Sequence, residues 1–320
     1  MAIPIAKILH YASFAPSVHN TQPWRFVAKY VELSLFSEPT RTLKAGDPTT
    51  RELWVSLGIC LEAVILASKG LGYTATITFI QTDDPLQEIA RLRFEEATEA
   101  QPELLELLQN RHSYRDDMKP TTLPPSLIAS CRQTIHDLPN TSLVLVETTQ
   151  TIQQIADITD KGMRLALSSS AFRKELAPLL HYNWSKSKTG LHGYVMGHNW
   201  LGSIWQKWSI LLGVDGQRQA KADKQRVLQA SGLLFITSRG DVPHFWFEVG
   251  RAYLRVVLEI TREGYAHSTL TAPVEAARFH EDIEKMLHTT DRIQSMIRIG
   301  KATHPLKHTS PRLPAEELLT

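Results

Sequence analysis

The sequence predicts an α+β protein that contains two related halves. Its 320 residues exceed the length of one typical core, which favours two domains or one large fused unit. Strand-like alternation and long helical patterns follow one another along the chain. Three pairs of identical residues are each separated by 192 positions: Gly58 with Gly250, Gly72 with Gly264, and Tyr73 with Tyr265. The repeat indicates a duplication, and the alternative is that two amphipathic helices ending in glycine look alike by chance.

The first elements follow from local patterns. Residues 4–15 carry apolar side chains at helical spacing, and Pro16 ends that pattern. Apolar and polar residues then alternate over residues 24–37, which predicts two short strands of a hairpin. A polar loop rich in special residues therefore lies between the first helix and the first strand.

A strongly apolar helix is predicted over Leu53–Lys69. Thr49 and Glu52 are three residues apart and fit a capping box at its start. A strand is expected over Thr74–Ile80, followed by a charged helix on the solvent side over Glu95–Asn110. The later elements are strands at Ser142–Glu147, Gly232–Ser238 and Met296–Gly300, and helices around Thr149–Ser168, Asn199–Leu212 and Phe245–Glu263.

Composition excludes several classes of function. The formal net charge is only +2, and no basic stretch interleaved with aromatic residues supports nucleic-acid binding. Apolar runs such as Leu61–Ala67 are too short to cross a bilayer, and Met1–Lys7 lacks the cationic start of a signal peptide. Cys60 and Cys131 show neither metal-ligand nor disulfide-framework spacing. The sequence thus predicts a cytoplasmic protein with no metal and with neither a membrane nor a nucleic acid as partner.

The loop of residues 16–24, PSVHNTQPW, is the densest cluster of special residues. Serine, asparagine and glutamine side chains there could present donors and acceptors to the edge of a planar heterocycle. A flavin's pyrimidine edge is one such surface. The alternative is a plain turn in which Asn20 caps the helix end and Pro23 starts a strand.

A second cluster is Arg111-His112-Ser113-Tyr114-Arg115. In an extended segment, alternate side chains face the same way, so its two arginines and its serine would converge on one side. Two guanidinium groups beside a hydroxyl suit a phosphate, because arginine offers bidentate donors and a permanent charge. The alternative is a solvated charged turn.

No competing chemistry has comparable support. The sequence has no GxGxxG after a strand, no P-loop, no HExxH and no GxSxG elbow. Three histidines, His181, His192 and His198, are interpreted as loop residues rather than metal ligands. No catalytic acid or base is identified. A basic patch near the C-terminus is typical of a loose tail if taken alone: Arg298, Lys301, Lys307 and Arg312.

Three motifs together resemble the nitroreductase superfamily, with the match closest to its fused Acg-like branch. They are the PSxxNxQPW loop at 16–24, the RxSxR segment at 111–115, and a late strand at 298–300. In ordinary members of that family, two identical subunits build each FMN site, one supplying RxSxR and the other PSxxNxQPW. Each motif occurs once here, in a different half. The resemblance therefore implies one complete FMN site and one inactive site.

The resemblance also implies the fold and the first site residues. The expected fold is two fused halves, residues 1–105 and 106–320, each a mainly antiparallel sheet flanked by helices. Arg111 and Ser113 are expected to contact the FMN phosphate or ribityl chain. Arg115 is expected near N1 and the C2 carbonyl, where positive charge favours the reduced, anionic flavin.

The same resemblance assigns roles to the loop and to the late basic patch. Ser17 and Asn20 are expected to meet the flavin ring, and Arg312 is similar to the family's late phosphate-binding arginine. The position two residues before Arg312 is often lysine in the family and is Ser310 here. Phosphate binding is therefore expected to be weaker, or Lys307 takes the place of that lysine. The other loop residues expected to line the site are Pro16, His19 and Gln22.

An insertion at about 181–215 holds four of the seven tryptophans, with several glycines between them. Apolar residues recur at helical spacing from Trp200 to Leu211, so a helix after a glycine-rich hinge is expected. One interpretation is a lid over the flavin, similar to that of the Acg-like branch. The other is a core helix after a long loop.

The predicted function is an FMN-dependent oxidoreductase of nitroreductase type. NAD(P)H would reduce the flavin and leave, and a small-molecule electron acceptor such as a nitroaromatic or a quinone would then take its place, in a ping-pong scheme. The alternative is a non-enzymatic FMN-binding or storage protein whose insertion closes the site. A duplicate that has lost the flavin is a third interpretation. The fused chain is expected to be a monomer or a homodimer.

Overall fold

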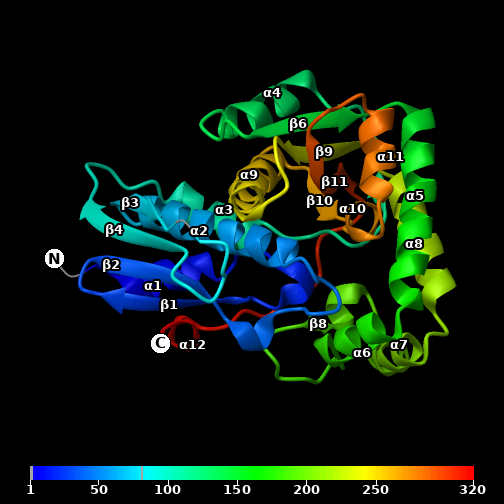
Figure 1. Ribbon diagram of the computed structural model, residues 1–320, viewed down its shortest axis with the longest axis horizontal. Coiled ribbons are helices and arrows are strands. Elements are labelled where there is room, and N and C mark those ends of the chain that lie inside the picture. Colours follow the sequence, from blue (N-terminus) through cyan, green and yellow to red (C-terminus); the bar gives the residue numbers. More distant parts are fainter. Residues whose placement is uncertain (1–2, 81) are drawn as a thin grey trace.

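The computed structural model describes residues 3–80 and 82–320 and contains two antiparallel sheets on either side of a pair of long helices (Figure 1). The first sheet has the strand order β1-β2-β4-β3, and every neighbouring pair is antiparallel. Its strands are β1 (Trp24–Lys29), β2 (Glu32–Ser37), β3 (Tyr73–Phe79) and β4 (Ala90–Glu96). The sequence prediction of an α+β fold with mainly antiparallel sheets is thus confirmed.

The second sheet has the order β10-β11-β9-β6, again with antiparallel neighbours, and the short β5 pairs with the far end of β11. All seven residues of β9 are buried, because helices cover both faces of this sheet. The strands are β5 (Met118–Lys119), β6 (Thr141–Val146), β9 (Gly232–Ser238), β10 (Ala266–Thr269) and β11 (Arg292–Ala302).

The two central helices, α2 (Arg51–Gly70) and α9 (Pro243–Arg262), pack against each other with reciprocal glycine contacts. A Cβ on Gly58 would lie 2.0 Å from the carbonyl oxygen of Phe247, and one on Gly250 would lie 2.0 Å from that of Val55. Val55 and Phe247 are also 192 residues apart. The packing therefore has the symmetry that the internal repeat predicts, while the duplication itself stays a prediction.

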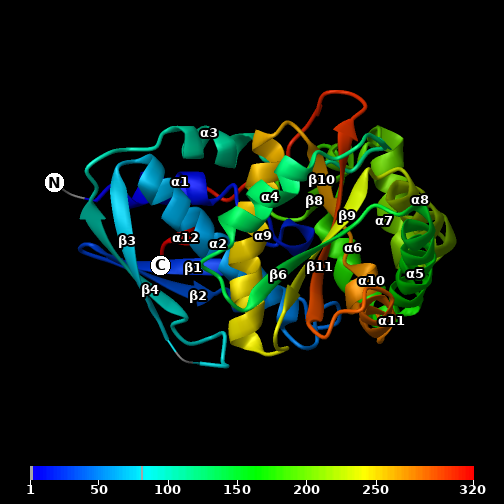
Figure 2. The same ribbon diagram turned by 90° about the horizontal axis from the view of Figure 1, so that it is seen from above.

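The remaining helices surround these layers. Side chains of α5, α8 and α11 form a second core on the face of the second sheet that points away from α9. Figure 2 shows α5, α7 and α8 at the end of the molecule opposite the N-terminus. The α-helices are α1 (Ile5–Ala12), α3 (Glu103–Asn110), α4 (Pro125–Thr134), α5 (Thr149–Ser168), α6 (Ser170–Leu179), α7 (Trp200–Leu212), α8 (Gly216–Leu228), α10 (Ala272–Glu275), α11 (Phe279–Met286) and α12 (Ala315–Leu318). Short elements are η1 (Val18–Asn20), η2 (Pro39–Arg41), η3 (Gly193–Met196), β7 (Leu180–His181) and β8 (Leu191–His192).

Two sequence predictions about local structure are wrong. The capping box at Thr49 does not form: the Asp47 carboxylate accepts from the amide of Leu53 at 2.8 Å and caps α2 instead. The charged helix does not begin at Glu95, because that residue belongs to β4, whose inward side chains are apolar and whose outward side chains are charged. The helical part, α3, begins only at Glu103.

The longest apolar helix lies inside the molecule. By length and composition α2 could cross a membrane, with a mean hydropathy of 1.6 over its best window, so apolar stretches in this chain are longer than the sequence pattern indicated. However, 89% of that window is buried, and the helix forms the centre of the main core. The C-terminal residues also join the first half, where Leu319 bridges to Phe26 of β1.

Candidate functional site

A cavity of about 270 Å³ lies where the loop after α1 meets the second sheet. Its lining comes from both halves of the chain, including Val55 and Ile59 of α2 and Ser268 and Met296 of the second sheet. A smaller hollow of about 40 Å³ shares lining residues with it. The shared residues are Pro16, Ser17, Ser113 and Arg115. The two spaces thus form one site with a wide part and a narrow part.

The loop before β1 holds an unusual backbone. His19, Asn20 and Gln22 all have positive φ angles, of 47°, 57° and 50°. Such angles are uncommon for residues other than glycine and are found at sites that the surrounding structure holds in place. The amide of Gln22 donates to Oγ of Ser17 at 2.8 Å, which closes the loop on itself. Pro16, Ser17 and His19 consequently face the cavity.

The two amide side chains of this loop bind other segments of the chain. Nδ2 of Asn20 donates to the carbonyl oxygens of Gly190 and Pro311, each at 3.1 Å. Nε2 of Gln22 donates to the carbonyl oxygen of Lys188 at 2.8 Å, and its Oε1 accepts from the amide of Leu313 at 2.9 Å. Asn20 still lines the narrow hollow, whereas Gln22 is fully buried and lies outside the described lining of both spaces.

Three arginines converge on the narrow hollow: Arg111, Arg115 and Arg312. The extended segment from Arg111 runs beside β10, and the amide of Tyr114 donates to the carbonyl oxygen of His267 at 2.8 Å. Arg111, Ser113 and Arg115 of this segment line the hollow, and so does His112, which the predicted alternation placed on the other side. None of the described residues that line this hollow is acidic.

Among the residues that the structure describes, these arginines form no ion pair. Arg111 is 2% exposed, and its Nε and Nη1 have no hydrogen-bond partner among the described residues. Burial, together with the neighbouring guanidinium groups, lowers the pKa of Arg115 to about 10 and that of Arg312 to about 9. Unpaired buried donors and mutually repelling cations are both costly, so this pocket is suited to an anion.

The side chains of the hollow are positioned by neighbours. Oδ1 of Asn20 accepts from Nη1 of Arg312. Arg298 is fully buried in β11, and its Nη2 donates to the carbonyl oxygens of Tyr114 at 2.7 Å and Asp116 at 2.9 Å, on either side of Arg115. Interpreting Arg298 as part of a loose basic tail is therefore wrong, because it holds the arginine segment in place.

The polar wall of the wide cavity was not predicted from the sequence. Gln219, Asp223 and Arg226 line it from one face of α8. Asp223 is 3% exposed, accepts from Arg226 at 2.7 Å and from Gln219 at 3.2 Å, and burial raises its pKa. The spacing of four and then three residues on a helix was the available signal, since such positions share one face.

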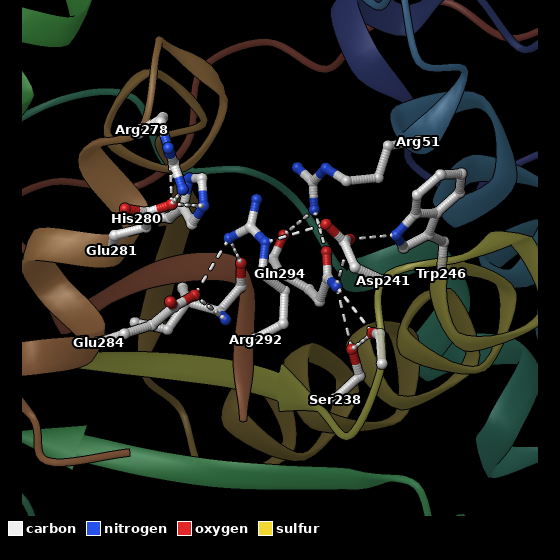
Figure 3. A network of polar contacts seen from close by, with 12 residues as sticks. Arg51, Ser238, Asp241, Trp246, Arg278, His280, Glu281, Glu284, Arg292 and Gln294 are labelled. Atoms are coloured by element: carbon white, nitrogen blue, oxygen red, sulfur yellow. Dashed lines mark hydrogen bonds and ion pairs between the residues drawn. The ribbon is translucent and has the colours of Figure 1, made fainter. Parts of the chain in front are cut away.

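Two residues that line the cavity, Arg51 and Gln294, belong to the polar network drawn in Figure 3. Nη1 of Arg51 donates to the backbone oxygen of Gln294 at 2.6 Å and to its side-chain Oε1 at 2.7 Å, and both residues line the cavity. Nε2 of Gln294 continues to Oδ1 of Asp241 at 3.0 Å, which also accepts from Nε1 of Trp246 at 2.6 Å. The network joins α2, β11 and the start of α9, and so fixes the halves relative to one another at the site.

Two histidines at the site are neutral at pH 7. Burial, and then the charge of Arg115, lowers the pKa of His19 to about 4. Burial, and then the charge of Arg111, lowers the pKa of His112 to about 4. Neither adds positive charge to the arginine cluster near neutral pH.

The insertion contributes to the site through its first part. Leu191 and Met196 line the wide cavity, and Val195 lines the narrow hollow. The helix predicted at 199–212 is present as α7, which buries Ile210 in a small core cluster and leaves large side chains such as Trp205 exposed. The segment before α7 thus lines the site, and its interpretation as a lid stays a prediction.

Comparisons with known proteins give similarity along the whole chain. No family model matches. A protein of Mycobacterium tuberculosis named "Putative NAD(P)H nitroreductase acg" is 25% identical, with 98% of this chain and 94% of the relative covered. A second one, named "Putative NAD(P)H nitroreductase Rv3131", is 41% identical over 73 residues, which cover 23% of this chain and only 21% of that relative.

Solved structures are also similar to this chain, at lower sequence identity. The FMN-dependent nitroreductase NfnB of Mycobacterium smegmatis, in complex with NADPH, is 12% identical, with 66% of this chain and 94% of that chain covered and a TM-score of 0.44. Iodotyrosine deiodinase bound to FMN and 3-iodo-L-tyrosine is 15% identical, with 65% and 94% covered and a TM-score of 0.43.

Proposed function

Because the chain belongs to the nitroreductase superfamily, we propose that it binds one FMN and acts as an FMN-dependent NAD(P)H oxidoreductase. The observation that carries this proposal is the set of three arginines in the narrow hollow, of which Arg111 is buried, with unpaired donors on Arg111 and Arg312 and no acidic residue among the described lining. A phosphate dianion supplies the acceptors and the charge that these groups lack. Arg111 and Arg312 would hold the phosphate, with Ser113 beside them, and Arg115, which lines both spaces, would approach the ring.

The wide cavity has the chemistry that a flavin ring needs. Val55 and Ile59 of α2 offer apolar contact, whereas Gln219, Asp223 and Arg226 offer polar atoms. A planar ring with one polar edge suits such a lining. The cations of Arg226 and Arg115 would stabilise negative charge on that edge in the reduced state. We therefore assign the phosphate to the hollow and the ring to the cavity.

The residues of the chain then have mainly binding and positioning roles. Bound FMN supplies two-electron transfer from NAD(P)H to an acceptor, and this chemistry needs little help from an acid or base. Leu191 and Met196 limit the access of water and of bulky molecules from the insertion side. Asn20 and Gln22 anchor the loop to the segments at 188–190 and 311–313. A small nitroaromatic or quinone is the acceptor class we propose.

The repeat favours a single working site. The residues that correspond to Val55 and Ile59 at a separation of 192 are Phe247 and Arg251. These side chains are larger, and they are already engaged: Phe247 contacts Phe79 with ring centroids 5.9 Å apart, and Nε of Arg251 donates to Glu62 at 2.8 Å. A bulky ring and a paired guanidinium would fill the place of the second flavin, so we propose one FMN per chain.

A storage protein is the second candidate, and one observation favours it. Leu191, Val195 and Met196 of the insertion face the two parts of the site, so the insertion could shut out a nicotinamide. Both functions require FMN binding, and they differ in whether NADPH reduces the bound flavin. Anaerobic addition of NADPH to the yellow protein separates them: rapid bleaching supports the enzyme, and lasting colour supports storage.

The FMN assignment is tested by the visible spectrum and by two variants. The purified protein should show flavin absorption, and Arg111→Ala and Arg312→Ala should lose FMN on gel filtration. Arg278→Ala is the control, because Arg278 has an 82% exposed side chain and is not among the lining residues of either space. Full FMN occupancy in both site variants would refute the phosphate assignment, and a colourless wild-type protein that takes up no added FMN would refute the function.

A further inference from the structure

The outer side of α7 is unusually apolar. Trp200, Trp205 and Trp208 are 57%, 58% and 50% exposed, and Leu201 and Leu212 are each 67% exposed. Monomeric proteins rarely leave so many large apolar side chains together in water. The buried side of the same helix is formed by Ser203, Ser209 and Ile210. The helix thus directs its larger apolar side chains outward.

These side chains form one continuous face. At about 100° per residue, Leu201, Trp205, Trp208 and Leu212 fall within an arc of about 60° on the helix surface. Figure 1 places α7 at the lower edge of the molecule. The exposed fractions of these four side chains show that the apolar arc is open to solvent.

Aromatic residues of the preceding loop extend this face. Trp184, which is 50% exposed, stacks on Tyr182 with ring centroids 4.9 Å apart and lies 5.1 Å from the ring of Trp200. Stacking holds the indoles in fixed positions, so little side-chain entropy is lost when they are covered. We call this surface the tryptophan face: Tyr182, Trp184, Trp200, Leu201, Trp205, Trp208 and Leu212.

Within the segment that carries the tryptophan face, the charged side chains have one sign. Residues 182–214 contain three lysines and no aspartate or glutamate. Lys186 and Lys188 are exposed on the loop, and Nζ of Lys207 lies 5.3 Å from the ring centroid of Tyr182. Tryptophan and tyrosine prefer the level of lipid headgroups, and lysine is attracted to anionic lipid. A helix with these residues suits the surface of an anionic bilayer.

We propose that the tryptophan face docks this protein on an anionic phospholipid bilayer, with α7 lying in the plane of the interface. Indole rings and leucines enter the boundary between headgroups and acyl chains, while the lysines contact the headgroups. The prediction that no membrane is a partner rested on the length of the apolar runs, which bears only on a spanning helix. A surface helix needs no such length, and α2 remains the core of the protein.

A second copy of this chain fits the face less well. In a two-fold symmetric dimer the same patch meets itself, so Lys186, Lys188 and Lys207 of each copy would approach those of the other. Like charges across an interface oppose association. With no acidic residue between positions 182 and 214, nothing within this segment compensates the repulsion.

Docking would also place the site near the bilayer. The insertion that carries the tryptophan face supplies Leu191 and Met196 to the cavity wall. A bilayer-dissolved acceptor could then reach the cavity along the insertion. This consequence rests on the proposed function, whereas docking itself does not.

Cosedimentation of the full-length protein with vesicles tests the proposal. Vesicles of phosphatidylcholine with phosphatidylglycerol should bind the protein, more strongly at low salt than at high salt, and pure phosphatidylcholine should bind it weakly. Binding should shift the tryptophan emission to shorter wavelength, because exposed indoles leave water. Flavin content and NADPH bleaching are recorded separately, so a failure of the flavin assignment does not affect this result.

Two pairs of variants and their controls define the contact. Trp205→Gln with Trp208→Gln should weaken binding to anionic vesicles at least about tenfold, because apolar area no longer leaves water. Leu86→Gln is the control, since Leu86 is 55% exposed in the other half. The thermal midpoints of these variants should equal that of the wild type, because the replaced side chains are exposed.

The lysines should act only on charged lipid. Lys186→Gln with Lys188→Gln should weaken binding to anionic vesicles about 25-fold, at about fivefold per lysine. Binding to neutral vesicles should not change. Lys29→Gln with Lys44→Gln removes two exposed lysines elsewhere and should have no effect.

Three results would overturn the proposal. One is the absence of wild-type binding to anionic vesicles at low salt. Another is equal binding by the tryptophan variant and the wild type. The third is a dimer in sedimentation velocity that the tryptophan variant dissolves, which would assign the face to a second copy.

Discussion

The side-chain oxygen of Asn20 accepts a hydrogen bond from the guanidinium of Arg312, 292 residues further along the chain. The same asparagine donates from Nδ2 to the carbonyl oxygen of Pro311, next to that arginine. The Asn20 side chain thus holds both the guanidinium of Arg312 and the backbone next to it at the narrow hollow. In the proposed function, Asn20 acts on the phosphate through Arg312.

Asn20→Ala should weaken FMN binding without abolishing it. The substitution leaves Nη1 of Arg312 with only one described partner, the carbonyl oxygen of Pro311 at 3.3 Å, and frees the segment at 311 from Nδ2 of Asn20. A lost hydrogen bond of a charged group is worth about 1.5–3 kcal/mol. The affinity should fall by roughly one to two orders of magnitude in a fluorescence titration of FMN-free protein. Asn110→Ala, at an exposed helix end, serves as the control. Unchanged affinity would mean that Arg312 is held by other contacts.

Gly58→Ala and Gly250→Ala should each destabilise the fold. Either added Cβ would lie 2.0 Å from a backbone oxygen of the facing helix, so α2 and α9 must separate. Overpacking of this kind costs about 1–3 kcal/mol. Gly216→Ala is the matched control, because its Cβ would meet Leu167 at an ordinary 3.4 Å. Thermal unfolding should show lower midpoints for the first two variants only, and an unshifted midpoint for both would refute the close approach.

Stability in the absence of FMN should fall as the pH drops below about 6.5. Burial lowers the pKa values of His19 and His112 to about 4 in the folded protein. Between these values and about 6.5 the unfolded chain binds more protons than the folded one, so acid favours unfolding. Both side chains are only partly buried, and about 1–2 kcal/mol should be lost by pH 5.

Urea unfolding at several pH values measures this loss. His19→Gln and His112→Gln should each flatten the dependence of the unfolding free energy on pH. His136→Gln, at an exposed position, should leave the slope unchanged. A slope that is the same in all three variants and the wild type would rule out the two site histidines as its source.

Arg226→Met should lower stability, and the double change with Asp223→Asn should restore much of it. Arg226 pairs with a carboxylate that is almost fully buried, and its loss leaves that charge unpaired. Since a quarter of the arginine side chain is exposed, the cost should be about 2 kcal/mol and below that of a fully buried pair. Recovery in the double variant, measured by urea unfolding, distinguishes an unpaired charge from lost packing. Equal stability of the two variants would contradict this account.

Much of the fold was predictable from local patterns. The hairpin at 24–37, the strand at 232–238 and the helix at 149–168 match the structure within about a residue, because side-chain periodicity and turn residues specify them. The prediction that the charged helix begins at Glu95 was wrong, because β4 is a short run of alternating apolar and charged residues, which periodicity alone assigns poorly. The Thr49 cap failed because Asp47, two residues earlier, reaches the same helix end.

The site was predictable in part. Arg111, Ser113 and Arg115 could be predicted to lie together, because side chains two residues apart in an extended segment face the same side. The sequence could not place Gln219 and Asp223, since α8 meets the cavity only through tertiary packing. Nor could it separate the roles of Asn20 and Gln22, whose partners lie more than 160 residues away. Their assignments as FMN contacts stay predictions.

Leu313 to Thr320 complete the first sheet region, where the amide of Thr320 donates to the carbonyl oxygen of Phe26. A ribosome releases Phe26 long before these residues exist. The loop at 16–24 must therefore wait, partly formed, until nearly three hundred further residues have been synthesised. Contacts between such distant positions form slowly. We expect the nascent chain to reach its native arrangement only after translation passes Arg312, when the early half finally receives the segment that seals it.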